Sequence, residues 1–384
     1  MLVKLLVLDP IIRKLRKANY HMLNTWKRAV VLLIFICSAC GVRSSTPQDS
    51  QSPDETMLPS IDTRGDPCAD YTAESVARKK VTFPITIRHA YGRTTIRKKP
   101  KRVATVGWQS QDIPLALGVV PVGMPGNISK LEKENGGVTP WVKDKFALLR
   151  ERTDAIYLDG APYQEIKAVK PDVILAVTPG LKYEQYFRLS SIAPVIVYSR
   201  SNWEMPMDCS IRMTARVLGM PKQGENLISN LHSLLNQTLT KHPGLMGKKI
   251  LFKVSDINFD TITLYTDKSL RMRLFTELGL PVPLIVRKYS ATAYDFTPVV
   301  KPEDIKYLSD VDLVISYGPT ENDPATIAAL QNSSTYGQIP AVKKGRVAVL
   351  GDKTPLSDLS SPTPLSIPWG IDRYFDLLEK TAKK

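Results

Sequence analysis

Short apolar runs alternate with helical patterns through most of this chain, and this alternation limits its possible folds more than any other sequence feature. From about residue 81 onward, the apolar runs have the length and composition of buried parallel strands. We expect strands at residues 103–106, 119–122, 173–177, 195–198, 250–254, 261–265, 284–286, 313–316 and 347–350. We expect helices between them at residues 111–117, 163–169, 183–190, 270–278 and 324–331. Strands that alternate with helices predict an α/β protein.

Two consecutive helices, at residues 208–218 and 223–241, interrupt this alternation near the middle of the chain. The second begins after Pro221 and ends at His242-Pro243-Gly244, and its apolar residues follow helical spacing. A long helix between two α/β segments indicates two lobes with a stiff connection. We predict an N-terminal lobe at 81–220, a connecting helix at 221–243 and a C-terminal lobe at 244–384.

Residues 29–39 form an apolar run behind a basic segment, and the run is far shorter than the roughly 20 residues of a spanning helix. This arrangement is typical of a signal peptide, which we place at residues 1–39, with Met22 as an alternative start to Met1. Small residues precede Cys40, as in the lipobox of bacterial lipoproteins, although Cys37 stands where that pattern has Leu. The resemblance implies a diacylglycerol on Cys40. Two ordinary cysteines in a buried helix are the other interpretation.

Residues 40–80 are predicted to be a lipidated flexible tether, because residues 43–66 are rich in Ser, Pro, Asp and Thr. The anchor would hold the protein on the extracytoplasmic face of the cell membrane. Cys68 and Cys209 would then be the remaining thiols, and an oxidising exterior would allow them to form a disulfide. One buried and one exposed free thiol are equally compatible with the sequence.

The net charge of +15 does not indicate a nucleic-acid partner. Seven basic residues against one acidic residue precede Cys40, and the later basic residues are scattered among acidic ones. Motifs for nucleophilic serine, phosphate-loop, zinc-protease and dinucleotide chemistry are missing from the sequence. With four histidines, a site for a bare transition metal is disfavoured. We therefore predict a protein that is not an enzyme and that has no resident metal or cofactor.

Aromatic and cationic side chains follow the predicted strand ends in both halves of the chain, where α/β sheets usually bind ligands. Rings give rigid contact area and guanidinium groups give forked donors, so this pattern suits a bulky, partly aromatic, anionic ligand. Taken singly, each side chain is more simply explained by packing, and the recurrence in both halves carries the prediction. The candidate ligand-binding residues are Trp108, Lys182, Tyr183, Arg200, Trp203, Tyr265, Arg271, Tyr294, Tyr317 and Lys353.

Several segments together resemble the substrate-binding lipoproteins of ABC importers for siderophores and cobalamin, and the iron-siderophore branch most closely. They are KRVATVGW at 101–108, LALGVVPVG at 115–123, KPDVILA at 170–176, LSSIAPVI at 189–196, LFTELGL at 274–280 and TPLSIPW at 363–369. The resemblance, over about residues 81–381, implies the class III fold: two Rossmann-like α/β lobes joined by a long rigid helix. It also implies a ferric siderophore, with its iron already chelated, bound between the lobes. The protein would be a monomer that delivers this ligand to an ABC permease and ATPase.

The resemblance further implies docking on the permease through one acidic residue in each lobe. Glu303 matches that position in the second half. In the first half the position falls on Gln164, with Glu165 beside it about 100° around the helix. Solvated acids at helix starts, without a docking role, are the other interpretation of these residues.

Alternative functions stay open at this point. A cobalamin or haem receptor would use the same fold. An extracytoplasmic enzyme that processes siderophores would need a nucleophile with a nearby base, or a cofactor loop. A purely structural surface lipoprotein would need neither paired lobes nor cationic residues at strand ends.

Overall fold

The computed structural model describes residues 67–72, 81–126, 129–149, 155–157, 163–176, 181–198, 205–254, 261–292 and 296–384. The predicted signal peptide, Cys40 and most of the predicted tether lie outside these ranges, as do Arg200, Trp203 and Tyr294. Within these ranges, no helix combines the length and apolar character that crossing a membrane requires.

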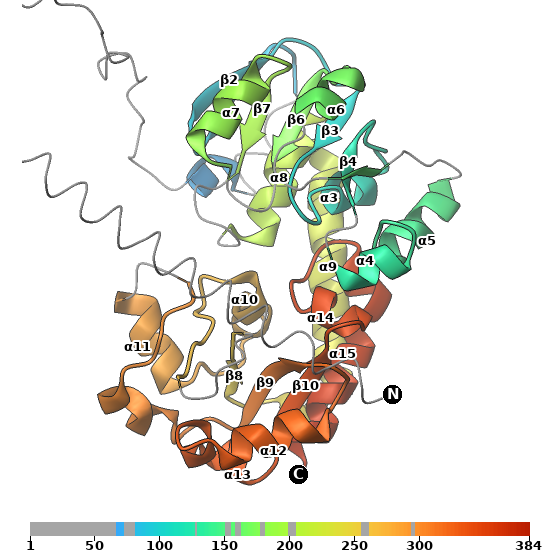
Figure 1. Cartoon of the computed structure of the whole chain (residues 1–384). Coiled ribbons are helices and arrows are strands. Elements are labelled where there is room, and N and C mark those ends of the chain that lie inside the picture. Colours follow the sequence, from blue (N-terminus) through green and yellow to red (C-terminus); the bar gives the residue numbers. More distant parts are fainter. Residues whose placement is uncertain are drawn as a thin grey trace, which may run out of the picture. The chain divides into compact units, whose positions relative to one another are not determined.

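The N-terminal half is built on a parallel sheet in the order β3-β6-β7 (Figure 1). Its strands are β3 (Val103–Thr105), β6 (Val173–Ala176) and β7 (Val195–Val197), and all of their residues are buried. Burial on both faces explains why these strands are continuous apolar runs in the sequence. The helices α6 (Tyr163–Ala168) and α7 (Tyr183–Ser190) connect the strands.

The N-terminal half also contains two smaller pairs of strands and the helices that lie between β3 and β5. An antiparallel hairpin joins β1 (Ile85–His89) to β2 (Gly92–Ile96), and β4 (Met124–Gly126) pairs in parallel with β5 (Ala155–Tyr157). Three helices, α3 (Asp112–Ala116), α4 (Lys130–Glu134) and α5 (Pro140–Leu149), lie between β3 and β5 in the chain. The hairpin, α4 and α5 are not among the elements expected from the sequence.

The C-terminal half has a second parallel sheet, in the order β10-β9-β8. Its strands are β8 (Ile250–Phe252), β9 (Leu313–Gly318) and β10 (Val347–Gly351). The surrounding helices are α10 (Leu270–Glu277), α11 (Leu284–Thr292), α12 (Pro324–Asn332), α13 (Pro340–Lys343) and α14 (Pro355–Leu359). A 3-10 helix, η4 (Pro302–Leu308), precedes β9.

The long central helix is α9 (Pro221–Lys241), which packs against α8 (Met207–Val217) and α15 (Ser366–Ala382). Pro221 begins α9, where a missing N–H costs no helical hydrogen bond. Gly224 allows the close approach of α8, because a Cβ there would lie 2.6 Å from the Cβ of Ala215. Two parallel sheets and a long helix confirm the predicted fold class (Figure 1).

Three expected strands are wrong. Residues 284–286 belong to helix α11, whose buried Ile285, Val286 and Tyr289 have helical spacing and follow two prolines. Residues 119–122 lie beside β3, but the regular strand is displaced to β4, after a bridge at Gly123. Residues 261–265 make only isolated antiparallel bridges, through Thr263 and Leu264.

Cys68 and Cys209 form a disulfide in the structure, with an S–S distance of 2.15 Å. Cys68 lies on the short 3-10 helix η2 (Pro67–Tyr71), within the segment predicted as a tether, and Cys209 lies on α8. The bond therefore attaches the chain at residue 68 to the central helices.

Candidate ligand-binding site

Three of the predicted ligand-binding residues meet in the C-terminal half. The Nε atom of Arg271 donates a hydrogen bond to the Tyr317 hydroxyl at 2.9 Å. The guanidinium carbon of the same arginine lies 4.8 Å from the centroid of the Tyr265 ring, which is a cation–π arrangement. Arg271 is thereby held in one orientation by two aromatic residues.

Local sequence explains why Arg271 stands at this place. Ser269 is the N-cap of α10, and its buried hydroxyl accepts from the backbone N–H of Arg271 at 3.3 Å. Arg271 is thus in the first turn of the helix. Helix α10 therefore presents this guanidinium group close to the carboxyl ends of the strands.

A wall of rings supports the arginine. Phe252, at the end of β8, lies 5.3 Å from Tyr265 and 5.5 Å from Tyr317 between ring centroids. Phe296 stacks on the other side of Tyr265 at 6.4 Å. Burial raises the pKa of Tyr265 to about 12, so this phenol stays neutral at ordinary pH. The cluster is aromatic with one fixed positive charge.

The hydroxyl of Tyr317 links the arginine to the segment that follows α14. Its oxygen lies 2.8 Å from Ser360 Oγ, which itself donates to the backbone carbonyl of Ser357 at 2.6 Å. Because that hydroxyl proton of Ser360 is used, Tyr317 donates to Ser360 and accepts from Arg271. Ser360 therefore fixes the tyrosine that fixes the arginine.

In the N-terminal half, Trp108 lies half-buried in the loop that follows β3. The loop contains Gly107 at φ 94° and Gln109 at φ 60°, and the second value is unfavourable for a residue with a side chain. The Gln109 amide donates to the backbone carbonyl of Asp358 at 3.3 Å. This bond connects the Trp108 loop to the segment that also contains Ser360.

Two buried aspartates flank this connection. Asp112 Oδ2 accepts from Thr363 Oγ1 at 2.6 Å and from Trp141 Nε1 at 2.8 Å. Asp358 Oδ2 accepts from Ser129 Oγ at 2.8 Å. Burial raises the pKa of Asp112 to about 7 and that of Asp358 to about 6, against the lowering effect of these hydrogen bonds.

Asp112 and the neighbouring Gln111 contain buried polar atoms that make no hydrogen bond with the described residues. The Oδ1 atom of Asp112 is buried without a hydrogen-bond partner among the described residues, and the same holds for both polar atoms of the Gln111 side chain. Buried polar groups are usually paired, so this part of the loop carries a cost that the surrounding structure must offset.

Three more of the predicted ligand residues, Lys182, Tyr183 and Lys353, are described and lie outside the Arg271 cluster. Lys182 is exposed. The ring centroid of Tyr183 lies 5.5 Å from that of Tyr91, in a separate aromatic group at the β1–β2 hairpin. Lys353 is exposed and lies 3.7 Å from Glu134 of α4.

The predicted docking residues are all exposed. Gln164 and Glu165 lie on the first turn of α6, and Glu303 lies on the first turn of η4. Glu303 is followed by a buried acid, Asp304, which is held by Lys288 at 2.5 Å and by Tyr289 at 2.9 Å. Asp304 is therefore held in place by Lys288 and Tyr289, whereas Glu303 is exposed to solvent.

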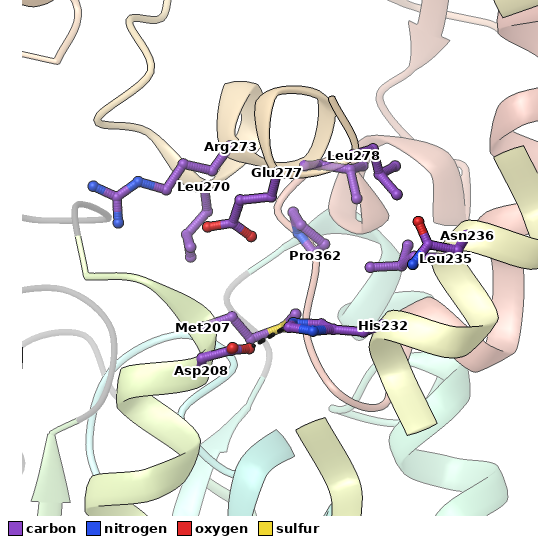
Figure 2. Close-up of a pocket in the computed structure, with 11 residues that line it drawn as sticks. Met207, Asp208, His232, Leu235, Asn236, Leu270, Arg273, Glu277, Leu278 and Pro362 are labelled. Atoms are coloured by element: carbon purple, nitrogen blue, oxygen red, sulfur yellow. Dashed lines mark hydrogen bonds and ion pairs between the residues drawn. The ribbon is translucent and has the colours of Figure 1, made fainter. Parts of the chain in front are cut away.

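A separate cavity of about 360 Å³ lies between α8, α9 and α10 (Figure 2). Asp208 and His232 meet at 3.0 Å on one side of it, and Arg273 and Glu277 of α10 line the other side. None of the predicted ligand-binding residues that the structure describes lines this cavity. The residues of α10 that line the cavity are Leu270, Arg273, Leu274 and Glu277, and Arg271 is not among them.

Sequence reasoning missed Gln109, Asp112, Ser129, Asp358 and Ser360. Gln109, Asp112 and Ser129 have hydrogen-bond partners more than 200 residues away in the chain. Ser360 meets Tyr317 at the end of another strand. No short sequence motif therefore contains both members of such a pair. A polar run such as WQSQD directly after a buried strand is the one local signal that something other than packing holds this loop.

Two parallel sheets with surrounding helices, together with a long central helix, are the fold of a class III binding protein. The comparisons agree. Residues 103–354 match the family described as periplasmic binding protein. The chain belongs to this family, which consists of extracytoplasmic substrate-binding proteins rather than enzymes. The resemblance, the fold class and the prediction of a protein without catalytic activity are thereby confirmed.

Individual relatives cover much of the chain. PiaA of Streptococcus pneumoniae, solved in complex with ferrichrome, is 37% identical, with a TM-score of 0.72 over 78% of this chain and 99% of that chain. PiaA is described as an iron uptake ABC transporter substrate-binding protein. A periplasmic solute binding protein of Mycobacterium smegmatis is 26% identical, with a TM-score of 0.61 over 78% and 98% of the two chains.

A curated relative matches over a shorter stretch. The ferric-anguibactin-binding protein FatB of Vibrio anguillarum is 31% identical over 129 residues. These residues are 34% of this chain and 36% of FatB, so the chain spans about a third of that protein in the match.

Proposed function

We propose that this protein captures a ferric siderophore outside the cell membrane and delivers it to an ABC permease. The observation that carries the proposal is the likeness to PiaA, which extends over 99% of that chain and was solved with ferrichrome. The name of FatB, a ferric-anguibactin-binding protein, supports the same class of ligand.

The site chemistry suits this ligand class. In a ferric siderophore the iron is already wrapped by chelator oxygens, so the protein contacts the chelator and needs no metal ligands of its own. Arg271 would present its guanidinium charge to those oxygens, and the Tyr265 ring beneath it, backed by Phe252, would give apolar area. Trp108 extends this surface from the other half of the chain, and Tyr317 holds the arginine in place.

Delivery requires a partner at the membrane. We propose that Glu303, together with Glu165 or Gln164, docks on basic residues of the permease, since all three side chains are exposed at helix starts. Cys40 would carry the lipid anchor that keeps the protein beside the permease. The protein would act as a monomer, with no nucleic-acid partner.

The test is a titration of the purified protein with ferrichrome, followed by tryptophan fluorescence. Saturable quenching at micromolar ligand supports the proposal. Haemin and cyanocobalamin serve as competing ligands for the two receptor alternatives, and absorbance of the protein as purified shows whether either is retained. Saturable binding of haemin or cyanocobalamin without any response to ferric siderophores would contradict it.

A further inference from the structure

The Trp108 loop and Arg271 belong to opposite halves of the chain, yet both are attached to residues 358–363. Gln109, next to Trp108, donates to the backbone carbonyl of Asp358 at 3.3 Å. Ser360, in the same segment, lies 2.8 Å from the Tyr317 hydroxyl that accepts from Arg271. The segment is therefore a shared support of the Trp108 loop and of the Tyr317–Arg271 pair.

Two carboxylates, one from each half of the chain, attach this segment to the N-terminal half. Asp112 of the N-terminal half accepts from Thr363, and Asp358 of the C-terminal half accepts from Ser129. The aspartates are 0% and 6% exposed. Hydrogen bonds to a carboxylate are stronger than neutral ones, and exclusion of water strengthens them further.

The loop itself needs such support. Gln109 adopts φ 60°, which is costly for a residue with a Cβ, and the neighbouring Gln111 amide is buried without a partner among the described residues. A loop with these costs keeps one conformation only where contacts from elsewhere fix it. The bonds to residues 358–363 are contacts of this kind.

We propose that Asp112 and Asp358 are positioning residues for ligand binding. Asp112, directly after the Trp108 loop, accepts from Thr363, and the Asp358 carboxylate accepts from Ser129 at the start of α4; together they hold the N-terminal half against residues 358–363 and so fix the indole relative to Arg271. The proposal rests on the proposed function, because that function makes Trp108 and Arg271 contacts of the ligand. A site whose two sides are fixed before binding loses less conformational entropy when the ligand enters.

The binding test uses the purified full-length chain and ferrichrome as the probe. Asp112→Ala and Asp358→Ala each remove a carboxylate, whereas Asp112→Asn and Asp358→Asn keep an oxygen that can accept the same hydroxyl. We expect each alanine variant to bind ferrichrome about 10-fold more weakly, because each leaves a hydroxyl without its acceptor, and an unpaired buried polar group costs about this factor. We expect the asparagine variants to restore most of the affinity.

A second readout does not depend on the ligand. The protein is labelled with 5-fluorotryptophan, and the fluorine resonance of Trp108 is assigned by its loss in Trp108→Phe. Ser129→Ala removes the hydroxyl that donates to Asp358, together with its N-cap bond from the backbone N–H of Glu132, and should shift or broaden this resonance. Thr381→Val is the matched control, because its buried hydroxyl donates to the backbone carbonyl of Leu377 within the same helix.

The two readouts separate the inference from the function on which it rests. An unchanged Trp108 resonance in Ser129→Ala and in both folded alanine variants would overturn the positioning role, whatever the affinities are. Failure of the asparagine variants to restore the wild-type resonance would also overturn it. If the wild-type protein binds no ferrichrome while the resonance responds as expected, the proposed function fails and the positioning of the loop stands.

Discussion

The Arg271 guanidinium group donates to the Tyr317 hydroxyl at 2.9 Å, across 46 residues of the chain and from a helix to the end of a strand. The same hydroxyl lies 2.8 Å from Ser360, so the arginine is one end of a fixed series of hydrogen bonds. A charge that is held in place before binding can contact a ligand without losing its own freedom at that moment.

Arg271→Ala should weaken ferrichrome binding by about 10- to 100-fold, because a hydrogen bond to a charged group contributes about 1.5–3 kcal/mol. Arg271→Lys should not restore the affinity, since an ammonium group lacks the planar fork and the contact with the Tyr265 ring. Fluorescence titration measures both variants. Arg273→Ala is the matched control on the same helix, because Arg273 lines the other cavity. Equal losses in the two alanine variants would contradict a specific role for Arg271.

Glu303→Ala should leave ferrichrome binding by the purified protein unchanged and should lower iron uptake by cells. The reason is that Glu303 is exposed, while its neighbour Asp304 makes the structural bonds to Lys288 and Tyr289. Binding is measured by titration and uptake with radioactive ferric ferrichrome. Glu165→Ala and Gln164→Ala, measured in the same way, show which residue of α6 contributes to docking. Loss of binding in purified Glu303→Ala would refute the docking role.

Removal of the disulfide should lower the free energy of unfolding by about 2–5 kcal/mol, because the bond between Cys68 and Cys209 closes a long loop. The double variant Cys68→Ser/Cys209→Ser, or treatment of the wild type with a reductant, tests this by urea unfolding. Ferrichrome affinity should change little, because neither cysteine belongs to the Arg271 cluster. A reductant that leaves the unfolding midpoint of the wild type unchanged would show that the thiols are free in solution.

Sequence patterns predicted the strands of both parallel sheets because these strands are buried on both faces, which requires continuous apolar runs such as residues 173–176. The same criterion failed at residues 284–286, because three apolar residues in a row also fit the first turn of the partly buried helix α11. Short runs of this kind do not separate a strand from a helix.

The site was predicted only where chemistry lies close to a strand end. Tyr317 fulfils this condition at the end of β9, whereas Tyr265 and Arg271 were placed after an expected strand at 261–265 that makes only isolated bridges. The structure nevertheless brings the three residues together. Asp112 and Asp358 could not be predicted in this way, because the proposed positioning role depends on distant partners. Thr363, for example, lies 251 residues away from Asp112 in the chain. Which distant hydroxyl meets which carboxylate is decided by the packing of α3 and α4 against the C-terminal segment. A single sequence carries no signal of that packing.

Asp112→Asn should reduce the pH dependence of stability. Burial raises the pKa of Asp112 to about 7 in the folded protein, while the unfolded chain titrates near the ordinary value of about 3.9. Between these values the folded state binds a proton that the unfolded state has released, so the free energy of unfolding falls as the pH rises from 4 to 7. Asp358, with its pKa raised to about 6, contributes in the same direction.

Asparagine keeps an acceptor for Thr363 and Trp141 and does not ionise, so Asp112→Asn should approach or exceed wild-type stability as the pH rises above 7. Urea unfolding across the range from pH 4.5 to 8.5 measures the effect, which should reach up to a few kcal/mol at the alkaline end. Asp144→Asn is the matched control, because Asp144 accepts from Trp369 Nε1 at 2.9 Å on the exposed surface. Parallel stability curves for the wild type and Asp112→Asn would mean that the buried carboxyl does not titrate in this range, and that its charge is compensated within the folded protein.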